Sequence, residues 1–180
     1  MVNIEVKQLP AYEVAYIRRT GSYFEPQDHW MSLMQWAIEN GLFPPHQSFI
    51  GISLDDPNFV EDSNCRHDAC VTIPEGFDKE KHKEINFKKL DGGLYALYPF
   101  YDTPEKLNFA YQYMFGEWLP NSVYIPDDER YNLEFSLNNP SDDPDGKLKV
   151  DLLVPIKIEI LKLKYNNISI TVGMRCFFIS

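Results

Sequence analysis

The chain is short of cysteine, of basic side chains and of long apolar runs. It has 180 residues with three cysteines, and 17 Lys and Arg stand against 27 Asp and Glu, a formal net charge of −10. The deficit of cationic side chains argues against nonspecific binding to nucleic acid or to an anionic membrane surface, because both attractions need positive charge. The sequence has no run approaching the roughly 20 apolar residues of a membrane-spanning helix, and its first ten residues lack the pattern of a signal peptide. We therefore expect a cytoplasmic protein with no direct nucleic-acid or membrane partner.

Three cysteines are too few for a disulfide framework. Cys65, His67 and Cys70 are close in sequence, which is compatible with a metal site. If this segment is a strand, however, side chains alternate, so Cys65 and His67 share one face while Cys70 points to the other. No second pair of ligands follows at zinc spacing. The sequence therefore predicts reduced thiols and neither metal nor cofactor.

An internal repeat is the most informative feature that is present. Leu9 and the segment Val14-Ala15-Tyr16 lie 81 positions before Leu90 and Tyr95-Ala96-Leu97. Two extra residues then enter the second copy, and Ser53-Leu54-Asp55-Asp56-Pro57 aligns with Ser136-Leu137-Asn138-Asn139-Pro140 at a shift of 83. The order, spacing and hydrophobic phase agree along both copies. Such self-similarity predicts a duplicated architecture.

Each copy has the pattern of a β-α-β-β unit. Strand-like segments open the copies, one helix is expected to begin near Pro26, and the other at Asp102-Thr103-Pro104, where a capping residue precedes proline. Two strands follow each helix. The predicted strands cover residues 12–19, 48–55, 66–73, 94–101, 131–138 and 149–155. Residues 2–8 add a short edge strand, and the charged stretch 75–89 is expected to be a surface connection.

Apolar residues at helical spacing predict which face of each helix is buried. The first stripe contains Trp30, Leu33, Met34, Ala37 and Ile38, and the second contains Leu107, Ala110, Tyr111, Met114, Phe115 and Trp118.

The fold class that follows is α+β. Two duplicated β-α-β-β units form one antiparallel sheet with two helices on one face and a central cleft where the copies meet. This domain covers residues 1–156, with repeats at about 3–74 and 84–156. Residues 157–180 have no counterpart in the repeat, and their alternating pattern around Asn166-Asn167 predicts a β-hairpin extension.

Several short motifs follow one another in a recognisable order. They are Leu9-Pro10-Ala11, Val14-Ala15-Tyr16-Ile17-Arg18, Gly21-Ser22-Tyr23, Ile50-Gly51-Ile52 through Asp55-Asp56-Pro57, Arg66-His67-Asp68-Ala69-Cys70-Val71, Gly92-Gly93-Leu94-Tyr95-Ala96, Trp118-Leu119-Pro120-Asn121-Ser122, and Glu134 six residues before Pro140. Together they resemble the GyrI-like small-molecule-binding family, which includes DNA gyrase inhibitor proteins and the effector-binding domains of AraC- and MerR-type regulators. The resemblance covers residues 3 to about 156, and the fold of the family is the duplicated arrangement inferred from the repeat.

The resemblance implies a role for Glu134. In this family a glutamate on the penultimate strand lies in an aromatic cleft and receives cationic or amphipathic ligands. Pattern alone predicts instead that Glu134 is a solvated carboxylate, because it alternates with Leu133 and Phe135 and so lies on the polar face of its strand. Two departures from the family pattern affect the pocket. Ser136 replaces a common aromatic, and Tyr101-Asp102-Thr103-Pro104 replaces a glycine-containing turn.

Aromatic side chains are the other candidate ligand-binding residues, because Phe, Tyr and Trp make up 14% of the chain. Trp36, Phe109 and Tyr113 lie off the buried stripes of their helices, which favours the cleft. Tyr16 and Tyr98 occupy repeat-related strands and are candidate walls. Trp118, from the second stripe, completes the set.

Three functions are compatible with these residues. The leading hypothesis is a stand-alone protein that binds amphipathic or cationic aromatic compounds and acts in sensing or sequestration. The second is a gyrase-inhibitor-like protein whose partner is the topoisomerase. The third is a hydrolase of reactive cyclopropane-bearing compounds, as some family members resemble, in which Glu134 would be the general base and Tyr16 or Tyr98 would assist. The natural ligand and the oligomeric state stay open.

Overall fold

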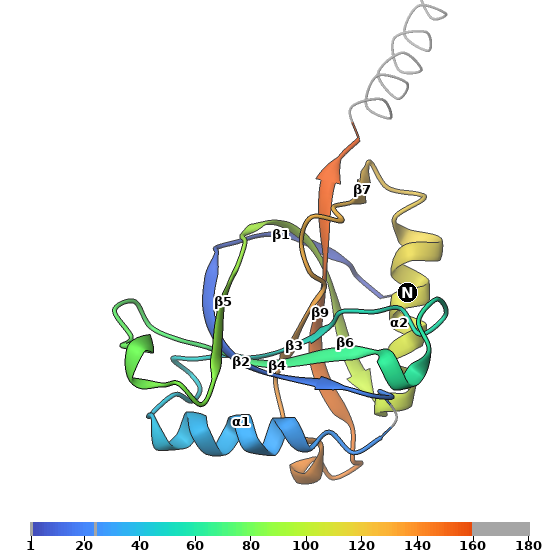
Figure 1. Ribbon diagram of the computed structural model, residues 1–180. Coiled ribbons are helices and arrows are strands. Elements are labelled where there is room, and N and C mark those ends of the chain that lie inside the picture. The colour runs from blue at the N-terminus through green and yellow to red at the C-terminus, as the bar shows by residue number, and fades with distance from the viewer. Residues whose placement is uncertain (1, 24, 160–180) are drawn as a thin grey trace, which may run out of the picture.

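The computed structural model describes residues 2–23 and 25–159, which form one antiparallel sheet and two helices (Figure 1). The helices are α1 (Asp28–Glu39) and α2 (Leu107–Tyr113). The strands are β1 (Glu5–Leu9), β2 (Tyr12–Thr20), β3 (Phe49–Ser53), β4 (Arg66–Thr72), β5 (Asn86–Leu90), β6 (Gly93–Asp102), β7 (Tyr124–Pro126), β8 (Leu133–Ser136) and β9 (Leu148–Ile158).

The strand order confirms the duplicated architecture. The sheet runs β1-β6-β9-β8-β3-β4-β2-β5, with β7 paired to β9 outside this path. Three strands of the first copy, β2-β4-β3, therefore mirror three strands of the second, β6-β9-β8. The copies join where β3 pairs with β8, and Gly51 lies directly opposite Glu134 in that pair. These two residues are themselves equivalent at the repeat shift of 83, so the pseudo-twofold axis passes between them.

The first strand of each copy pairs with a strand of the other copy. β1 pairs with β6, and β5 pairs with β2. The prediction of a surface connection over residues 75–89 is therefore wrong at its end, because β5 begins at Asn86. The two lysines of β5 interrupt the apolar pattern expected of a strand, although Phe87 and Leu90 pack into the cores. The corners before β2 and β6 touch so closely that a Cβ on Gly92 would lie 2.6 Å from the Leu9 carbonyl oxygen.

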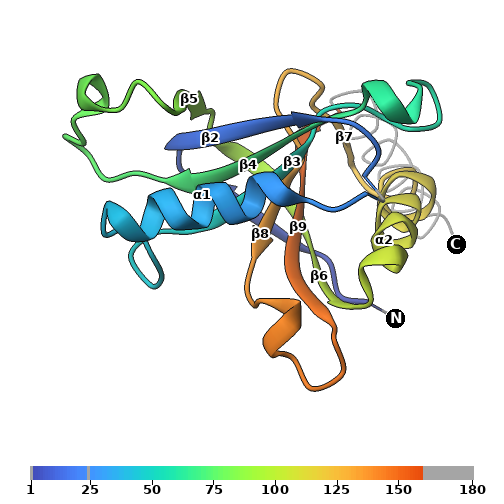
Figure 2. The ribbon, with the colours of Figure 1, turned by 60° about the horizontal axis from the view of Figure 1, so that its bottom comes forward.

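Both helices cover the same face of the sheet. Figure 2 shows α1 lying along β2 and β4, while α2 lies against β6. Three apolar clusters fill the space between helices and sheet, centred on Leu33, Met114 and Phe100. A fourth cluster around Val14 and Leu153 lies on the opposite face, around which β1 and β5 curve. Burial on both faces of the central strands explains why their sequences are nearly continuous in apolar residues.

The first helix, α1, buries a face that is rotated about the helix axis relative to the predicted apolar stripe. Leu33 and Ala37 are buried as expected, but Trp36 is also buried, whereas Met34 and Ile38 are 41% and 60% exposed. The cause is the segment after β4, which folds over the C-terminal half of α1. Phe77, His82 and Phe87 contact the Trp36 ring, and Trp36 Nε1 donates a hydrogen bond to Glu84. Trp36 therefore belongs to the core instead of the cleft.

The second helix begins with a 3₁₀ turn at Pro104–Lys106 and ends in a π-helical turn at Met114–Trp118. In this turn the Leu119 amide donates to the Met114 carbonyl at 2.9 Å. The wider turn buries both Met114 and Leu119. A regular helix, on which the predicted stripe was based, would separate these two residues by about 140° around its axis.

Gly116 lies in the π-helical turn, and a Cβ placed on it meets no atom within 4 Å. Gly116→Ala is therefore expected to raise the free energy of unfolding by about 0.5–1 kcal/mol, because alanine loses less backbone entropy on folding. Urea denaturation of both proteins measures the change. A fall in stability would show that the π-helical turn itself requires glycine.

Within residues 2–159, apart from residue 24, no helix is long and apolar enough to cross a membrane. Cys65 and Cys70 are free and buried. Over the described residues, 2–23 and 25–159, no group of three or more His, Cys, Asp or Glu side chains is arranged to hold a metal ion. The predicted boundary at 156 falls inside β9. Cys176 and the hairpin expected around Asn166-Asn167 lie outside the described residues.

Candidate functional site

A polar cluster of Gly51, His67 and Glu134 lies on the pseudo-twofold axis, on the face of the sheet that carries the helices, and we call its centre above Gly51 the notch. Gly51 has no side chain, and the position that its Cβ would occupy is 3.2 Å from Glu134 Oε2 and 3.2 Å from His67 Nε2. A Cβ there would crowd both atoms, so glycine in one copy of the repeat leaves room for the glutamate of the other and for His67. β3, β4 and β8 each contribute one of the three residues of the cluster.

Glu134 is held from the side of the second helix. The Tyr111 hydroxyl donates a hydrogen bond of 2.7 Å to Glu134 Oε1, and Ser53 Oγ lies 3.5 Å from the same oxygen. Burial raises the pKa of Glu134, and the two hydroxyls only partly oppose this. Burial and the neighbouring carboxylate raise the pKa of Tyr111 well above its ordinary value, so the phenol stays a donor. Among the described residues, Oε2 has no hydrogen-bond partner and faces the notch.

Two histidines form the opposite wall. His29 Nε2 and His67 Nδ1 are 2.7 Å apart, and both side chains are buried. Burial, followed by the neighbouring His29, lowers the pKa of His67 to about 4. Burial also lowers the pKa of His29, so both rings are neutral at pH 7. The rings of Trp30 and Tyr23 lie 6.0 and 6.3 Å from the His67 ring.

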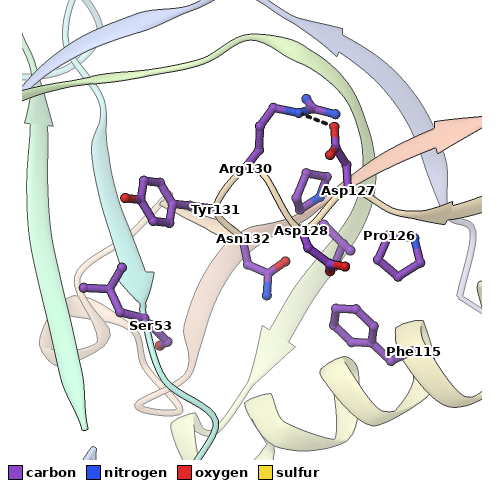
Figure 3. A pocket seen from close by; sticks show the side chains of 11 residues that line it. Ser53, Phe115, Pro126, Asp127, Asp128, Arg130, Tyr131 and Asn132 are labelled. Atoms are coloured by element: carbon purple, nitrogen blue, oxygen red, sulfur yellow. Dashed lines mark hydrogen bonds and ion pairs between the residues drawn. The ribbon is translucent and has the colours of Figure 1, made fainter.

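A pocket of about 280 Å³ includes Ser53 and Phe115 in its lining, whereas Glu134 does not line it (Figure 3). Two of its residues connect it to the glutamate, because Ser53 lies against the carboxylate and the Phe115 ring stacks on Tyr111 at 6.5 Å and 13°. Its size approaches the lower end of small-molecule sites. The lining residues are Ser53, Leu54, Phe115, Pro126, Asp127, Asp128, Arg130, Tyr131, Asn132, Val154 and Pro155.

Three of the aromatic candidates lie along the second helix and its strand. Tyr98 is in the same row across the sheet as Glu134, separated by Leu152, and its ring contacts Tyr113 at 6.0 Å. Phe109 is 64% exposed. Tyr98 and Phe109 line a second hollow of about 310 Å³, between α2, β6 and Val2, that does not include Glu134.

Three other candidates are not brought to Glu134. Trp36 is in the core beneath α1, and Trp118 stacks on Tyr124 at 6.0 Å. Tyr16 lies on the opposite face of the sheet, where Lys88 is 4.7 Å from its ring centroid. Alternation along β2 explains this placement, because the adjacent Ile17 is the residue that faces α1.

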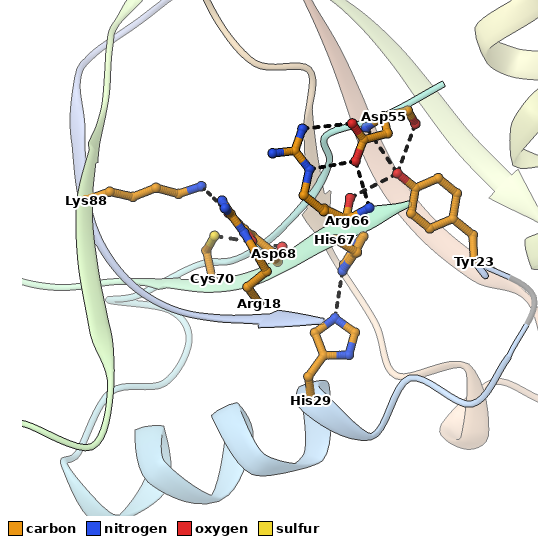
Figure 4. A network of polar contacts seen from close by, with 9 residues as sticks. All are labelled: Arg18, Tyr23, His29, Asp55, Arg66, His67, Asp68, Cys70 and Lys88. Atoms are coloured by element: carbon orange, nitrogen blue, oxygen red, sulfur yellow. Dashed lines mark hydrogen bonds and ion pairs between the residues drawn. The ribbon is translucent and has the colours of Figure 1, made fainter. Parts of the chain in front are cut away.

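A second polar network lies on the face opposite the notch (Figure 4). Asp68 is fully buried and accepts hydrogen bonds of 2.7 and 2.8 Å from Arg18 and one of 2.6 Å from Lys88. Burial alone would raise the pKa of Asp68, but the two cations outweigh it and hold the pKa below its ordinary value. Nearby, Asp55 binds the Arg66 guanidinium through both carboxylate oxygens. These paired charges make the network structural.

Sequence reasoning missed the nearest neighbours of Glu134. Tyr111 was assigned to the buried stripe of its helix, and it is partly buried against the cluster around Phe100, but its hydroxyl points to the carboxylate. The repeat itself carried a signal, because Tyr111 is equivalent to Trp30, which lies beside the histidine wall. No sequence pattern joined His29 to His67, since a helix and a strand bring them together across 38 positions.

The fold and the notch define a small-molecule-binding domain of the type that serves as an effector-binding module. Residues 2–157 match the GyrI-like small molecule binding domain, and the chain belongs to this family. It is 32% identical over 144 residues to the "SPbeta prophage-derived putative transcriptional regulator YosT" of Bacillus subtilis (strain 168), covering 77% of this chain and 94% of that protein.

Solved structures share the fold at low sequence identity. The C-terminal domain of EcmrR has a TM-score of 0.67 at 13% identity, with 88% of this chain and 99% of that domain covered. In a complex of EcmrR with DNA, this chain corresponds to 58% of the EcmrR chain. SAV2435 bound to tetraphenylphosphonium has a TM-score of 0.55 at 12% identity, with 86% of this chain and 94% of that protein covered.

Proposed function

We propose that this protein binds amphipathic or planar organic cations in the cleft between its two halves, with Glu134 as the anionic contact. The observation that carries the proposal is the half-buried carboxylate whose Oε2 faces the notch without a partner among the described residues. Such a group is costly in an apolar surrounding unless a cation or a donor meets it. An arriving cation offsets this cost.

Aromatic side chains supply the remaining affinity. Phe115 and Tyr111 present stacked rings between the pocket and Glu134. Tyr23 and Trp30 stand on the histidine side. Aromatic faces attract organic cations through their quadrupole and add dispersion contacts with a flat ligand. The tetraphenylphosphonium bound to SAV2435 is a ligand of this chemistry, which supports the proposal.

The biological role that fits is sensing or sequestration. The relative YosT bears the name of a transcriptional regulator, and the EcmrR domain is part of a longer DNA-bound chain. For this protein, an effect on transcription would therefore follow ligand capture. A gyrase partner is a separate proposal, supported only by the family's inhibitor branch and tested by inhibition of supercoiling at low protein concentration.

Fluorescence titration with ethidium, a planar cation, and with a neutral planar analogue tests the binding proposal. Glu134→Gln is expected to weaken ethidium binding at least tenfold, about 1.4 kcal/mol, because the amide keeps the shape but not the charge. Binding of the neutral analogue should be nearly unchanged. Glu80→Gln is the matched control, since it removes one charge from a surface side chain that is 89% exposed. Equal ethidium affinity in wild type and Glu134→Gln would remove Glu134 from the site.

The contact of Glu134 with Tyr111 also supports a second candidate function, hydrolysis of reactive cyclopropane-bearing compounds. A half-buried carboxylate with a raised pKa is suited to accept a proton from water, and a phenol 2.7 Å away is placed to assist. Tyr111 takes the place expected for Tyr16 or Tyr98. Turnover of such an electrophile, lost in Glu134→Gln, would favour hydrolysis, whereas stable binding without turnover would leave capture as the function.

A further inference from the structure

The notch presents two different polar atoms to whatever occupies it. Glu134 Oε2 approaches from β8 and His67 Nε2 from β4, each 3.2 Å from the Cβ position of Gly51. Within the part of the chain that the structure describes, neither atom has a hydrogen-bond partner. Because both atoms lie 3.2 Å from the same point, they are at most twice that distance apart, and neighbouring groups of one ligand can reach both.

The contact between His29 and His67 determines which ring nitrogen of the neutral His67 carries the proton. The pair needs one hydrogen on its 2.7 Å contact, supplied either by His29 Nε2 or by His67 Nδ1. If His67 supplied it, the neutral His29 would carry its proton on Nδ1, which is buried and has no partner among the described residues. A buried orphan N–H is rarer than a buried orphan acceptor. His29 Nε2–H is therefore the donor, and the neutral His67 carries its own proton on Nε2, facing the notch.

The fold does not require this pair. At the repeat shifts of 83 and 81, the second copy has Val150 in place of His67 and Ala110 in place of His29, and both are buried without any polar contact to satisfy. Two buried imidazoles, each with one nitrogen that has no hydrogen-bond partner among the described residues, cost stability relative to apolar side chains. That cost, on the copy whose glycine opens the notch, indicates a role in the site.

We propose that His67 is a specificity-determining residue that donates a hydrogen bond from Nε2 to an oxygen of the ligand, beside the cationic group that Glu134 receives. The inference rests on the proposed cation-binding function and narrows its ligand class. The preferred ligands are organic cations that carry a carbonyl, ether or hydroxyl oxygen within a few bonds of the charge. His29 is a positioning residue, because it holds the ring and sets its tautomer.

Three probes of matched shape separate the two contacts. Benzoylcholine carries both a quaternary ammonium and an ester carbonyl. Trimethyl(4-phenylbutyl)ammonium keeps the charge and the chain length but has no oxygen, and 3,3-dimethylbutyl benzoate keeps the ester but has no charge. Wild-type protein is expected to bind benzoylcholine about three- to tenfold more tightly than the oxygen-free cation, which corresponds to one neutral hydrogen bond.

Variants of His67 test whether this residue causes the preference for the oxygen-bearing cation. His67→Phe is expected to bring the ratio of the two cation affinities close to one, while both cations remain tighter than the neutral ester. His67→Gln, whose amide nitrogen lies near the position of Nε2, should restore part of the ratio. The matched control His46→Phe changes an exposed histidine and should leave the ratio unchanged.

A measurement on the wild type keeps the test independent of folding of the variants. The ¹⁵N–¹H resonance of His67 Nε2 is expected to shift with benzoylcholine and to move much less with the oxygen-free cation. Equal affinities of the two cations in wild type, or an unchanged ratio in folded His67→Phe, would overturn the assignment of His67 while leaving cation binding intact. If neither cation binds more tightly than the neutral ester, the proposed function itself fails.

Discussion

Asp68→Ala is expected to lower the free energy of unfolding by about 3–5 kcal/mol, the cost of breaking a buried ion pair by removing one partner. Asp68 is fully buried and is the common acceptor for Arg18 and Lys88. Without it, the Lys88 ammonium, whose side chain is only 16% exposed, keeps its charge between Tyr16 and Tyr131 with no counterion. Chemical denaturation of the two proteins measures the loss.

The second copy of the repeat offers a matched control. Asp151 is equivalent to Asp68 at the shift of 83, but Pro99 stands where the first copy has Arg18. Within the described residues Asp151 has no salt bridge, and burial raises its pKa, with Lys7 only partly opposing this effect. Asp151→Ala is therefore expected to change stability by less than about 1 kcal/mol. Equal losses in the two variants would contradict a structural role for the Asp68 network.

Lowering the pH from 6.5 to 4 is expected to cost the wild type about 3 kcal/mol more stability than it costs His67→Gln. The pKa of His67 is about 4 in the folded protein and about 6.5 when unfolded, so between these values the unfolded chain binds more protons. Stability contributed by the neutral ring is complete above pH 6.5, declines as the pH falls, and reaches its full loss below 4. Denaturation at several pH values gives the difference between the two proteins.

Other titratable groups close to His67 also change the stability as the pH falls, and their effects differ in direction. The raised pKa of Glu134 lets the folded state take up a proton first, which adds stability as the pH falls. The lowered pKa of Asp68 affects stability only below its ordinary range of about 4. Both groups are present in wild type and in His67→Gln, so the comparison reports the loss of the His67 ring together with any change in the pKa of its neighbour His29. An NMR titration that placed the pKa of His67 near 6.5 would contradict its buried position in the wall.

The repeat carried most of the fold prediction. Because the copies share one hydrophobic phase, strand positions and the common face of the two helices followed from local pattern. The exchange of β1 and β5 did not, because strand pairing between copies depends on tertiary contacts and the lysines of β5 hid its apolar side. Trp36 was misplaced for a related reason. The segment that buries it comes from residues 77–87, far along the chain.

The site was predictable only in part. The prediction that Glu134 is a pocket carboxylate came from family resemblance, since alternation alone gave a solvated side chain. Its contacts with Tyr111, Ser53 and the notch over Gly51 depend on which atoms meet across the pseudo-twofold axis. Local periodicity places Tyr111 on the packed face of its helix, but it does not show that its hydroxyl reaches a carboxylate on another element.

The two halves also show how a duplicated scaffold acquires a one-sided site. Gly51 and Glu134 are equivalent positions, and the absence of a side chain at one makes room for the carboxylate at the other. A Cβ at Gly51 would be tight against both Glu134 and His67. The asymmetry of the pair, more than either residue alone, places the carboxylate on the pseudo-twofold axis.

A crystal structure of the protein with bound ethidium is the most direct test of the central claim, that Glu134 on the pseudo-twofold axis receives an organic cation. The predicted result is a planar cation stacked against Tyr111 or Phe115, with its charged end facing Glu134 Oε2. Ethidium bound instead in the hollow formed by Tyr98, Tyr101 and Phe109, with no contact to Glu134, would contradict the claim.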